Sequence, residues 1–249
     1  MIDIHAHIIP GIDDGSPDME ESLEMARIAV SSGVTYIIAT PHFNLPWDKR
    51  PYTLEQLSQR LQELNDRLEK ERIPLTILPG MEVYGDDDLP LLFEQNRLMT
   101  LNRTKYLLIE FDFDEIEERI ADLLNLVKQN GRIPVIAHPE RYRCVQHNPQ
   151  FIYDCMAEGC LVQINKGSIL GRFGRGPRRA AIALLDHGLV TCVASDAHFA
   201  TMRTPYLREA YEEVREYFGG EYARMVFAEN PGLIMEGKEP RALRPLPFF

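Results

Sequence analysis

Short apolar runs rich in β-branched residues recur along the whole chain and constrain its fold more than any other feature of the sequence. They occupy residues 1–7, 34–42, 75–84, 106–113, 133–140, 160–168 and 189–198. Most of these runs are continuous rather than alternating, which is typical of parallel strands buried on both faces. Segments of helical pattern lie between them, and strands that alternate with helices form a parallel sheet with right-handed crossovers. Seven such units predict a closed or nearly closed α/β barrel, with an open doubly wound sheet as the main alternative.

The helices between these strands are predicted from their apolar spacing and their end signals. Apolar residues recur at steps of three and four within 53–72 and within 114–130, which gives each segment one apolar face. Ser16 and Pro17, followed by acidic residues, predict the N-cap and first turn of another helix. Glycines one to three residues before a strand are expected to end helices; these are Gly33, Gly131, Gly159 and Gly188.

The composition of the chain sets limits on its class. With 249 residues, of which 45% are hydrophobic, the chain can bury a sizeable core, and we expect one domain over residues 1–249. It has no apolar stretch long enough for a transmembrane helix and no signal-peptide pattern, so we expect a cytoplasmic protein without membrane insertion. A net charge of −11 argues against nucleic acid as a partner. The four cysteines lack CxxC spacing and are expected to be reduced.

Residues of the types that bind metals are concentrated where the predicted strands end. Five of the seven histidines, two glutamates and an aspartate lie at these ends, and a further aspartate lies in the loop after the first strand. The nine residues are His5, His7, Asp14, His42, Glu82, Glu110, His138, Asp196 and His198. In a barrel of parallel strands the C-terminal ends meet on one rim, where active sites are built. Each residue alone is weak evidence, but their coincidence at strand ends predicts a metal centre.

The mixture of ligand types indicates which ions this centre suits. Imidazoles combined with carboxylates suit manganese, iron or zinc, and the number of carboxylates favours manganese. Magnesium is a further alternative. Nine candidates exceed the needs of one ion and suit a cluster of two or three divalent ions, in which Glu82 or Glu110 would bridge because a carboxylate has two oxygens.

Some neighbouring residues have alternative interpretations. Asp13 is an alternative to Asp14, since the motif offers both carboxylates. Asp3 alternates with the first two histidines but is predicted to lie deeper, in the core. His147 and His187 fall in helical or loop contexts and are not expected to bind metal.

The motifs that carry the nine residues are IHAHIIPGIDDG, ATPH, GMEVY, LIEF, VIAHPERY and ASDAH, in this order. They resemble the polymerase and histidinol phosphatase (PHP) superfamily, and most closely the bacterial manganese-dependent protein tyrosine phosphatases of the CpsB/YwqE type. The resemblance extends from Met1 to about Asn230. It implies a distorted (β/α)7 TIM-like barrel, the PHP fold, with a trinuclear metal site formed by the nine residues. It also implies that Arg141 and Arg203 bind a phosphoryl group.

These residues predict metal-assisted hydrolysis of a phosphate monoester. Three divalent ions would bring six positive charges against four ligand carboxylates, which leaves the centre about two charges positive in an acidic protein. We expect a hydroxide that bridges two ions to attack phosphorus in line with the leaving oxygen, while both arginines stabilise the equatorial oxygens. His42 or His198 is a candidate to supply a proton or to position water. None of the four cysteines has an arginine six positions after it, which excludes thiolate catalysis of the usual tyrosine-phosphatase kind.

The substrate is less constrained than the reaction. The resemblance implies the phosphotyrosine-containing tail of a bacterial tyrosine kinase that controls capsule or exopolysaccharide synthesis. A small-molecule phosphatase, for example one that acts on histidinol phosphate, is the main alternative. A non-catalytic scaffold for the kinase is a further alternative, which the complete set of ligands and both arginines disfavour.

Three segments outside the motifs have open roles. In the loop over 46–52, Trp47 or Tyr52 is a candidate to stack on a phenol ring, with simple loop packing as the alternative. The arginines of the segment 172–179 would either attract an acidic peptide or form a solvated helix start; they are Arg172, Arg175, Arg178 and Arg179. The proline-rich tail after Gly237 is expected to lack regular structure, with Phe248 and Phe249 packed on the body of the protein.

Overall fold

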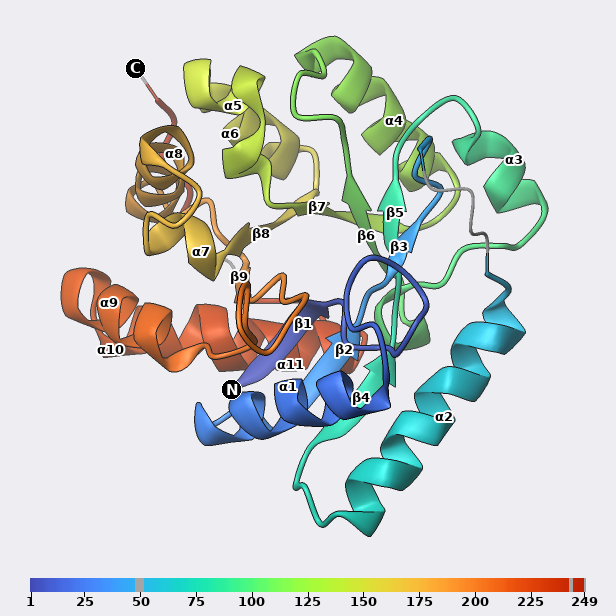
Figure 1. The fold of residues 1–249 in the computed structure, drawn as a ribbon. Helices are drawn as coiled ribbons and strands as arrows, with labels where there is room; N and C mark the ends of the chain where they lie inside the picture. Colours follow the sequence, from blue (N-terminus) through green and yellow to red (C-terminus); the bar gives the residue numbers. More distant parts are fainter. Residues whose placement is uncertain (48–51, 242–243, 249) are drawn as a thin grey trace.

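A computed structural model describes residues 1–47, 52–241 and 244–248. In these residues, parallel strands lie at the centre of the molecule and helices surround them (Figure 1). The strands are β1 (Ile2–Ala6), β2 (Tyr36–Ala39), β3 (His42–Phe43), β4 (Thr76–Pro79), β5 (Glu82–Tyr84), β6 (Tyr106–Glu110), β7 (Ile133–Ala137), β8 (Leu161–Asn165) and β9 (Cys192–Ala194).

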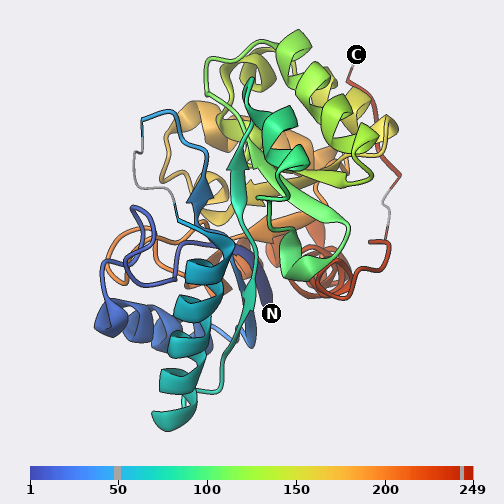
Figure 2. The same ribbon diagram turned by 90° about the vertical axis from the view of Figure 1, so that its right-hand side faces the viewer.

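Helices follow most of the strands, as the alternating pattern predicts. They are α1 (Met19–Ser31), α2 (Leu54–Lys70), α3 (Leu89–Glu94), α4 (Glu117–Gln129), α5 (Arg143–His147), α6 (Gln150–Ala157), α7 (Lys166–Ile169), α8 (Arg175–Asp186), α9 (Arg208–Phe218), α10 (Gly220–Arg224) and α11 (Asn230–Met235). Short 3₁₀ turns cover Leu101–Arg103 and Pro139–Arg141, and a π-helical turn covers Met225–Glu229. Helices α1 and α2 lie at one end of the molecule, whereas α4 and the C-terminus lie at the other (Figures 1 and 2).

Two of the predicted strands are each interrupted once. The run 34–42 divides into β2 and β3, and the run 75–84 divides into β4 and β5. The strands therefore form two parallel sheets, of order β1-β2-β4 and β3-β5-β6-β7-β8-β9. Pro41 has no N–H to donate between β2 and β3. The two interrupted runs nevertheless stay paired across their breaks, because the N–H of Glu82 donates to the carbonyl of Pro41 at 3.1 Å.

The last strand returns to the first, as a barrel requires. Beyond β9, Ala197 forms a parallel bridge with Ala6 at the end of β1. Two backbone hydrogen bonds support this contact, from His7 N–H to the Ala197 carbonyl at 2.8 Å and from Asp196 N–H to the His5 carbonyl at 2.9 Å. The predicted parallel α/β barrel with seven strand positions is thus confirmed, with its distortion at the breaks in the second and third positions, and the open doubly wound sheet is not observed.

The strands are buried on both faces, which explains their continuous apolar runs. In β6, Leu107 and Ile109 belong to the large cluster that includes the apolar face of α4. The alternate residues, Tyr106 and Leu108, belong to a second cluster with side chains of β1, β2, β7 and β9. Because both clusters exclude water, the carboxyl end of each strand is held rigidly.

The helix signals are confirmed with one correction. Gly33, Gly131, Gly159 and Gly188 all follow helices and have φ between 67° and 91°, which suits glycine at a helix C-terminus. The N-cap of α1 is Asp18 and not Ser16, because the Asp18 carboxylate accepts from the N–H of Glu21. The Ser16 hydroxyl is instead buried and hydrogen-bonds the Ser22 hydroxyl at 2.7 Å.

The C-terminal tail packs on the body of the protein, as predicted. Its described residues after Gly237 have no regular secondary structure. The ring of Phe248 stacks on His187, with ring centroids 3.7 Å apart and an interplanar angle of 16°. Phe249 lies outside the described residues. Within the described ranges, the helices are too short or too polar to cross a bilayer.

Candidate metal centre

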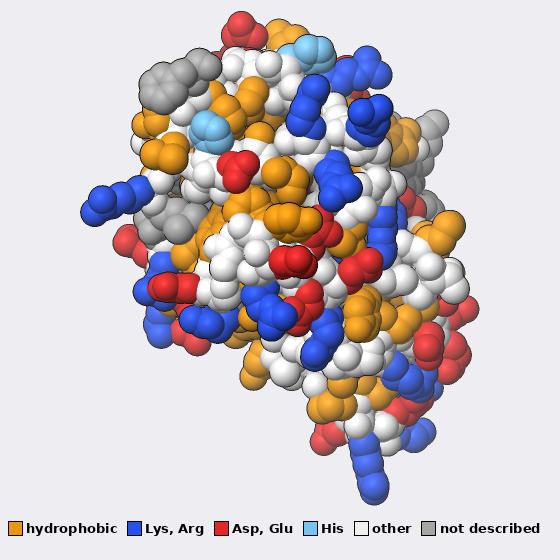
Figure 3. All heavy atoms as spheres, turned by 90° about the vertical axis from the view of Figure 1, so that its left-hand side faces the viewer, with side chains coloured by type: hydrophobic (Ala, Val, Ile, Leu, Met, Phe, Trp, Pro, Cys, Tyr) orange, Lys and Arg blue, Asp and Glu red, His pale blue; other side chains and the backbone are white. Residues whose placement is uncertain are grey.

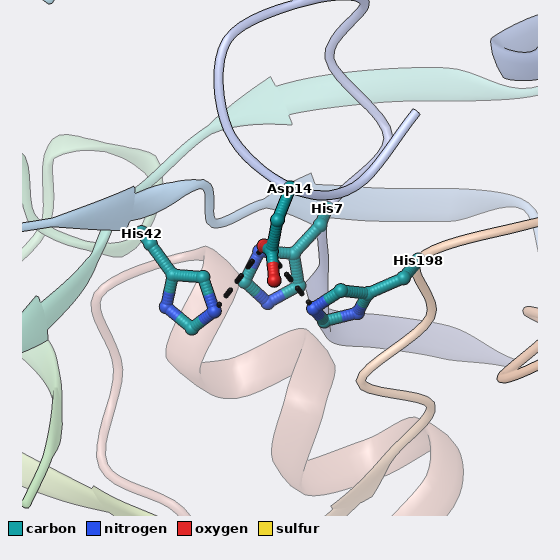
Figure 4. A group of neighbouring side chains, drawn as sticks. All are labelled: His7, Asp14, His42 and His198. Carbon is teal, nitrogen blue, oxygen red and sulfur yellow. Dashed lines mark ion pairs between the residues drawn. The ribbon is translucent and has the colours of Figure 1, made fainter. Parts of the chain in front are cut away.

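All nine residues predicted to bind metal come together at the carboxyl ends of the strands. In the described residues their donor atoms form four overlapping groups, and within each group the atoms lie within 4.8 Å of one another. The groups are His7, Asp14, His42 and His198; His5, His7 and Asp196; His5, Glu82 and His138; and His42, Glu82 and Glu110. The side chains of the first group point toward one another from three separate elements (Figure 4).

The deepest part of the centre is formed by β1 and the segment after β9. The Nε2 atoms of His5 and His7 lie 3.2 Å apart, since residues two apart on a strand point the same way. Oδ1 of Asp196 lies 3.6 Å from Nε2 of His5 and 3.5 Å from Nε2 of His7. Three ligand-type atoms from two distant segments thus face one point.

Glu82, the first residue of β5, lies between four histidines. Its Oε2 is 3.1 Å from His5, 3.3 Å from His7 and 3.0 Å from Nδ1 of His42. Its Oε1 is 2.9 Å from Nε2 of His138. Glu110 also contacts two histidines, at 2.9 Å from His42 and 3.8 Å from His138. Of the two carboxylates expected to bridge ions, Glu82 therefore has the more central position.

The outer part of the centre includes Asp14. Its Oδ1 lies 3.6 Å from Nε2 of His42 and 3.6 Å from Nε2 of His198, and its side chain is 60% exposed (Figure 4). Asp13 is buried and instead orients its neighbours: Oδ2 accepts from Nδ1 of His7 at 2.7 Å and from the N–H of His42 at 2.9 Å. The geometry favours Asp14 as the ligand and gives Asp13 the role of supporting one.

The other acidic and histidine alternatives lie outside the cluster. Asp3 is fully buried and accepts from the backbone N–H groups of His5 and Ser195, in agreement with the predicted core position. His147 lies in α5, where its Nδ1 contacts the Arg143 carbonyl. His187 contacts the C-terminal tail through the ring of Phe248 and the carbonyl of Leu246.

The cluster has the properties of a cation site. Several buried nitrogen and oxygen atoms of the cluster have no hydrogen-bond partner in the described residues: Glu82 Oε2, Glu110 Oε1, His42 Nδ1, His138 Nδ1 and His198 Nε2. Leaving such atoms unsatisfied costs about 1–3 kcal/mol each, which bound cations would recover. Imidazole nitrogens and carboxylate oxygens in this mixture fit manganese, iron or zinc.

The electrostatics of the cluster keep its carboxylates ionised, as metal binding requires. Burial opposes ionisation of Glu82, yet the His5 and His42 imidazoles hold the pKa of its carboxyl well below its usual range. Burial likewise opposes ionisation of Asp196, and the Arg203 guanidinium lowers the pKa of that carboxyl well below normal. Burial together with His7 lowers the pKa of His198 to about 2, which leaves its imidazole neutral. Burial opposes protonation of His5, His7 and His42, yet neighbouring carboxylates raise the pKa of these imidazoles, so bound cations would take the place of their protons. Carboxylates must be ionised and imidazoles neutral to bind a metal.

The backbone at the strand ends adopts an uncommon conformation. His138, Asp196 and Arg203 have φ values of 35°, 50° and 50°, in the left-handed region that non-glycine residues seldom occupy. Such positions cost about 1–3 kcal/mol and cluster at functional sites. Here the bends at His138 and Asp196 follow directly on β7 and β9, and the bend at Arg203 lies in the loop after β9.

A second layer of side chains, which sequence reasoning missed, holds the ligands in place. Gln163 Oε1 lies 2.8 Å from His5 Nδ1, and Asn165 donates to Asp196 Oδ2 at 2.6 Å. Gln163 also donates to Asn165, so the two amides form one chain of hydrogen bonds. Such partners fix ligand orientation and strengthen metal binding. Their position could have indicated this role, because the last three residues of β8 include two amides where other strands end in ligand-type residues.

Both predicted arginines border the cluster. An Nη atom of Arg203 lies 2.5 Å from Asp196 Oδ1, and one of Arg141 lies 3.7 Å from Asp196 Oδ2. The two side chains are 32% and 20% exposed. They line a cavity of about 350 Å³ together with His42, Glu110, His138 and Asp196. A larger cavity, of about 590 Å³, lies between α8, α9 and the tail and is lined by none of the nine residues.

Aromatic side chains line the same cavity, but the two candidates from the 46–52 loop differ. Trp47 is 65% exposed and lines the cavity, with its ring 5.5 Å from that of Tyr84. Tyr52 is buried, donates its hydroxyl to the Pro41 carbonyl at 3.2 Å and packs on Phe43. Simple loop packing, the alternative to stacking on a substrate ring, is therefore what the structure shows for Tyr52. Residues 48–51 lie outside the described part of the chain.

Two of the four arginines of 172–179 are paired with acidic side chains. Arg172 lies 2.5 Å from Glu209, and Arg178 lies 3.2 Å from Glu213, both in α9. Figure 3 shows the face that carries α8 and α9, where basic and acidic side chains lie next to one another. This pairing favours the solvated helix start over attraction of an acidic peptide.

The cysteines are unsuited to nucleophilic catalysis. Burial raises the pKa of the thiols of Cys144, Cys155 and Cys192, and it raises the pKa of Cys160 to about 11. A nucleophilic cysteine needs a lowered pKa. The exclusion of thiolate catalysis from sequence spacing is thus supported by the environment of each thiol.

Fold and site together define a parallel α/β barrel with a candidate multinuclear metal centre on the carboxyl rim. The sequence matches the family described as capsular polysaccharide synthesis, CpsB/CapC, over residues 1–236. It is 41% identical to the tyrosine-protein phosphatase YwqE of Bacillus subtilis over 241 residues, which cover 96% of this chain and 92% of YwqE. The chain belongs to the CpsB/CapC family.

Two further relatives agree with this assignment. The tyrosine-protein phosphatase CpsB of Streptococcus agalactiae is 34% identical over 242 residues, which cover 95% of this chain and 98% of CpsB. The crystal structures of YwqE from Bacillus subtilis and CpsB from Streptococcus pneumoniae are described as those of unique metal-dependent tyrosine phosphatases. A chain from that work superposes on this one with a TM-score of 0.92 at 38% identity, and covers 100% of both chains.

Proposed function

We propose that this protein is a metal-dependent protein-tyrosine phosphatase that folds as one domain. The observation that carries the proposal is a cluster of nine ligand-type side chains beside a cavity with aromatic walls, which four of the nine and two arginines line. Relatives named as tyrosine-protein phosphatases cover nearly the whole chain, which supports the same reaction here.

The residues present fit two or three divalent ions, with manganese the best match and iron, zinc or magnesium the alternatives. His5, His7, Glu82, His138 and Asp196 would hold the deep ions, and Asp14, His42 and His198 an outer one, with Glu110 beside His42. When bound, such ions lower the pKa of water to supply a nucleophile near neutral pH and offset the charge of a phosphoryl group.

The arginines of the chain bind and orient the phosphoryl group. Arg141 and Arg203 both lie beside Asp196 and line the cavity, so their N–H groups can donate to equatorial oxygens of the phosphoryl group. Donors fixed in advance stabilise charge that develops in the transition state without reorganisation. These two residues therefore contribute mainly to the chemical step.

Of the two histidines considered for proton transfer, His42 has the better position. His42 lines the cavity beside Arg141 and Arg203. His198 has a pKa lowered to about 2 and is not among the described lining residues. A tyrosine leaving group, with a pKa near 10, needs little help from a proton donor.

The proposed substrate is a phosphotyrosine in the tail of a bacterial tyrosine kinase that controls capsule synthesis. The family description, capsular polysaccharide synthesis, supports this context. Trp47, Tyr84 and Phe113 line the cavity beside the arginines and offer apolar contact for a phenol ring. Histidinol phosphate, the small-molecule alternative, has a smaller imidazole group and an alkyl leaving oxygen, which is harder to expel.

The test is reconstitution of the chelated protein. Manganese, iron, zinc or magnesium is added back separately, and hydrolysis of a phosphotyrosyl peptide and of histidinol phosphate is measured at equal metal. We expect turnover of the peptide, highest with manganese and absent with chelator. Preference for histidinol phosphate would reassign the substrate, and activity that persists in chelator would reject the metal mechanism.

A further inference from the structure

The guanidinium of Arg141 contacts two aromatic rings. Its central carbon is 4.3 Å from the ring centroid of Phe113 and 4.6 Å from that of Phe173. Phe113 follows β6, and Phe173 lies in the turn between α7 and α8, so the two rings come from segments 60 positions apart in the sequence. Both distances are within the range of a cation–π contact, which extends to about 6 Å.

The ring of Phe173 also contacts the second arginine. The guanidinium carbon of Arg203 lies 5.9 Å from its centroid. Phe173 is therefore shared by the two arginines proposed to bind phosphate. Among the described residues that line the cavity, Phe113 is included and Phe173 is not. Phe173 thus contacts both arginines without lining the described cavity.

The local sequence is adapted to this position of the ring. A Cβ on Gly167 would lie 2.7 Å from the Phe173 ring, so only glycine leaves room for it. The turn is closed by a hydrogen bond from the Arg172 N–H to the Gly167 carbonyl at 2.8 Å. Arg172 itself pairs with Glu209 on the outside. Within this segment, Phe173 is therefore the residue that contacts the two arginines of the site.

A physical need for such a support follows from the charges. Asp196 is an anionic partner 3.7 Å from Arg141, and an unsupported guanidinium would move closer to form a full ion pair. Contact with ring faces restrains the plane of the guanidinium and leaves its N–H edge free for a ligand. Two rings in contact with one guanidinium would keep these donors directed at the cavity.

We propose that Phe173 is a positioning residue that holds Arg141, and to a lesser degree Arg203, in the orientation that binds phosphate. The inference rests on the proposed role of these arginines in phosphate binding. It concerns the orientation of the arginines and not direct contact of Phe173 with the substrate.

The test measures binding of inorganic phosphate to the manganese-loaded protein by calorimetry. Phe173→Leu should weaken phosphate binding about fivefold to tenfold, whereas Phe173→Tyr, which keeps the ring, should restore most of it. Phe218→Leu is the matched control, because Phe218 is a half-buried phenylalanine of α9 that contacts the ring of Tyr222 on α10 and does not line the cavity beside the two arginines. The control should bind phosphate as the unaltered protein does. Unchanged phosphate affinity in Phe173→Leu would overturn the inference.

A double-mutant cycle distinguishes positioning from a general effect on the fold. If Phe173 acts through Arg141, Phe173→Leu should cost less in an Arg141→Ala background than in the unaltered protein. An equal or larger loss in that background would overturn the inference. If Phe173→Leu does not fold, Gly167→Ala displaces the same ring and should weaken phosphate binding in the same way, with metal content unchanged.

The result is independent of the substrate. Inorganic phosphate is the probe, so the assay reports on the arginines whichever ester the protein hydrolyses. Phosphate binding that responds to Phe173 without turnover of phosphotyrosyl peptide would reject the proposed substrate and keep the inference. Turnover of the peptide, combined with phosphate binding that does not change in Phe173→Leu, would keep the proposed substrate and reject the inference.

Discussion

Glu82 shows how much of the site depends on single side chains. It is fully buried, and its two oxygens contact four histidines. A buried carboxylate in this position is stable only with compensating positive charge, either from protonated imidazoles or from cations. Cations are the better solution, because several nitrogens around Glu82 and its neighbours have no hydrogen bond in the described residues.

Removal of one ligand should therefore remove metal and activity together. We expect His7→Ala and Glu110→Ala to lose at least one ion per chain and nearly all phosphatase activity, while the circular dichroism spectrum stays unchanged. His147→Ala is the control, because His147 lies in α5 and outside the cluster. Metal analysis by mass spectrometry with parallel kinetics decides the matter; full metal content and full turnover in both variants would refute the assignment.

In the same assays, loss of an arginine should lower activity without lowering metal content, unlike loss of a ligand. Arg203→Ala removes a donor to the phosphoryl group, for which losses of about 10²–10³ in rate are typical. Metal content should stay unchanged, since Arg203 contacts Asp196 without being a ligand. Arg172→Ala, which breaks only an exposed pair with Glu209, is the control and should keep its kcat/KM. An unaltered kcat/KM in Arg203→Ala would exclude Arg203 from the site.

At this scale the sequence predicted which residues converge but not their division of labour. Strand-end positions were sufficient to identify the nine members of the cluster, because the ends of parallel strands meet on one rim. The choice between Asp13 and Asp14 needed coordinates, since adjacent residues in a loop have no fixed orientation. Gln163 and Asn165 were missed because amides are seldom ligands, and Phe173 was missed because its role depends on contacts between distant segments.

At the scale of elements, the loop after β1 is held close to the strand by Gly15. A Cβ at this position would collide with the carbonyl oxygen and Cβ of His7. The same loop carries Asp13 and Asp14, and Ser16 N–H closes it by donating to the His7 carbonyl at 3.0 Å. The geometry of the outer part of the centre thus depends on one residue without a side chain.

Gly15→Ala should push this loop away from β1. We expect metal affinity to fall about 10–100-fold, the usual effect of disturbing the partners of a ligand, and activity to fall with it. Gly131→Ala is the matched control: its Cβ would meet open space, although a φ of 71° still costs about 1 kcal/mol of stability. Manganese titration of both variants is the measurement, and equal affinities would show that the loop is not held in this way.

A buried lysine fixes the segment after Arg203 to β8. Lys166 is 2% exposed and donates to the Tyr206 carbonyl at 2.8 Å, and burial lowers its pKa to about 8. In the unfolded chain its pKa is near 10.4, so the unfolded state holds the proton more tightly. The contribution of Lys166 to stability therefore rises as pH increases from about 8 to about 10 and is lost as pH falls through about 8.

Comparison with Lys166→Met isolates this effect. Between pH 7 and pH 10, the unfolding free energy of the unaltered protein should rise by about 2 kcal/mol relative to that of the variant. Urea denaturation of both proteins in chelator at the two pH values measures this difference. A difference that does not change with pH would show that Lys166 keeps an ordinary pKa in the folded protein.

Element boundaries were predicted less completely than element types. The apolar runs located every strand position, but the breaks within 34–42 and 75–84 were not foreseen, because a continuous run hides the point where a strand leaves one neighbour for another. The start of α1 was placed two residues early, since Ser16 and Asp18 are both good N-caps and only packing decides between them.

At the scale of the whole molecule, a protein of net charge −11 is proposed to bind an anionic substrate. Local charge makes this possible, because cations held by the cluster, together with Arg141 and Arg203, would outweigh the carboxylates around them. The fold makes this arrangement possible, because only a parallel barrel brings seven strand ends to one rim.

The most direct test of this account is anomalous diffraction at the manganese edge from crystals grown with manganese. We predict two or three peaks on the carboxyl rim, each about 2.0–2.3 Å from imidazole nitrogens or carboxylate oxygens of the nine residues. Absence of peaks at the rim, or manganese bound only elsewhere on the molecule, would contradict the central claim.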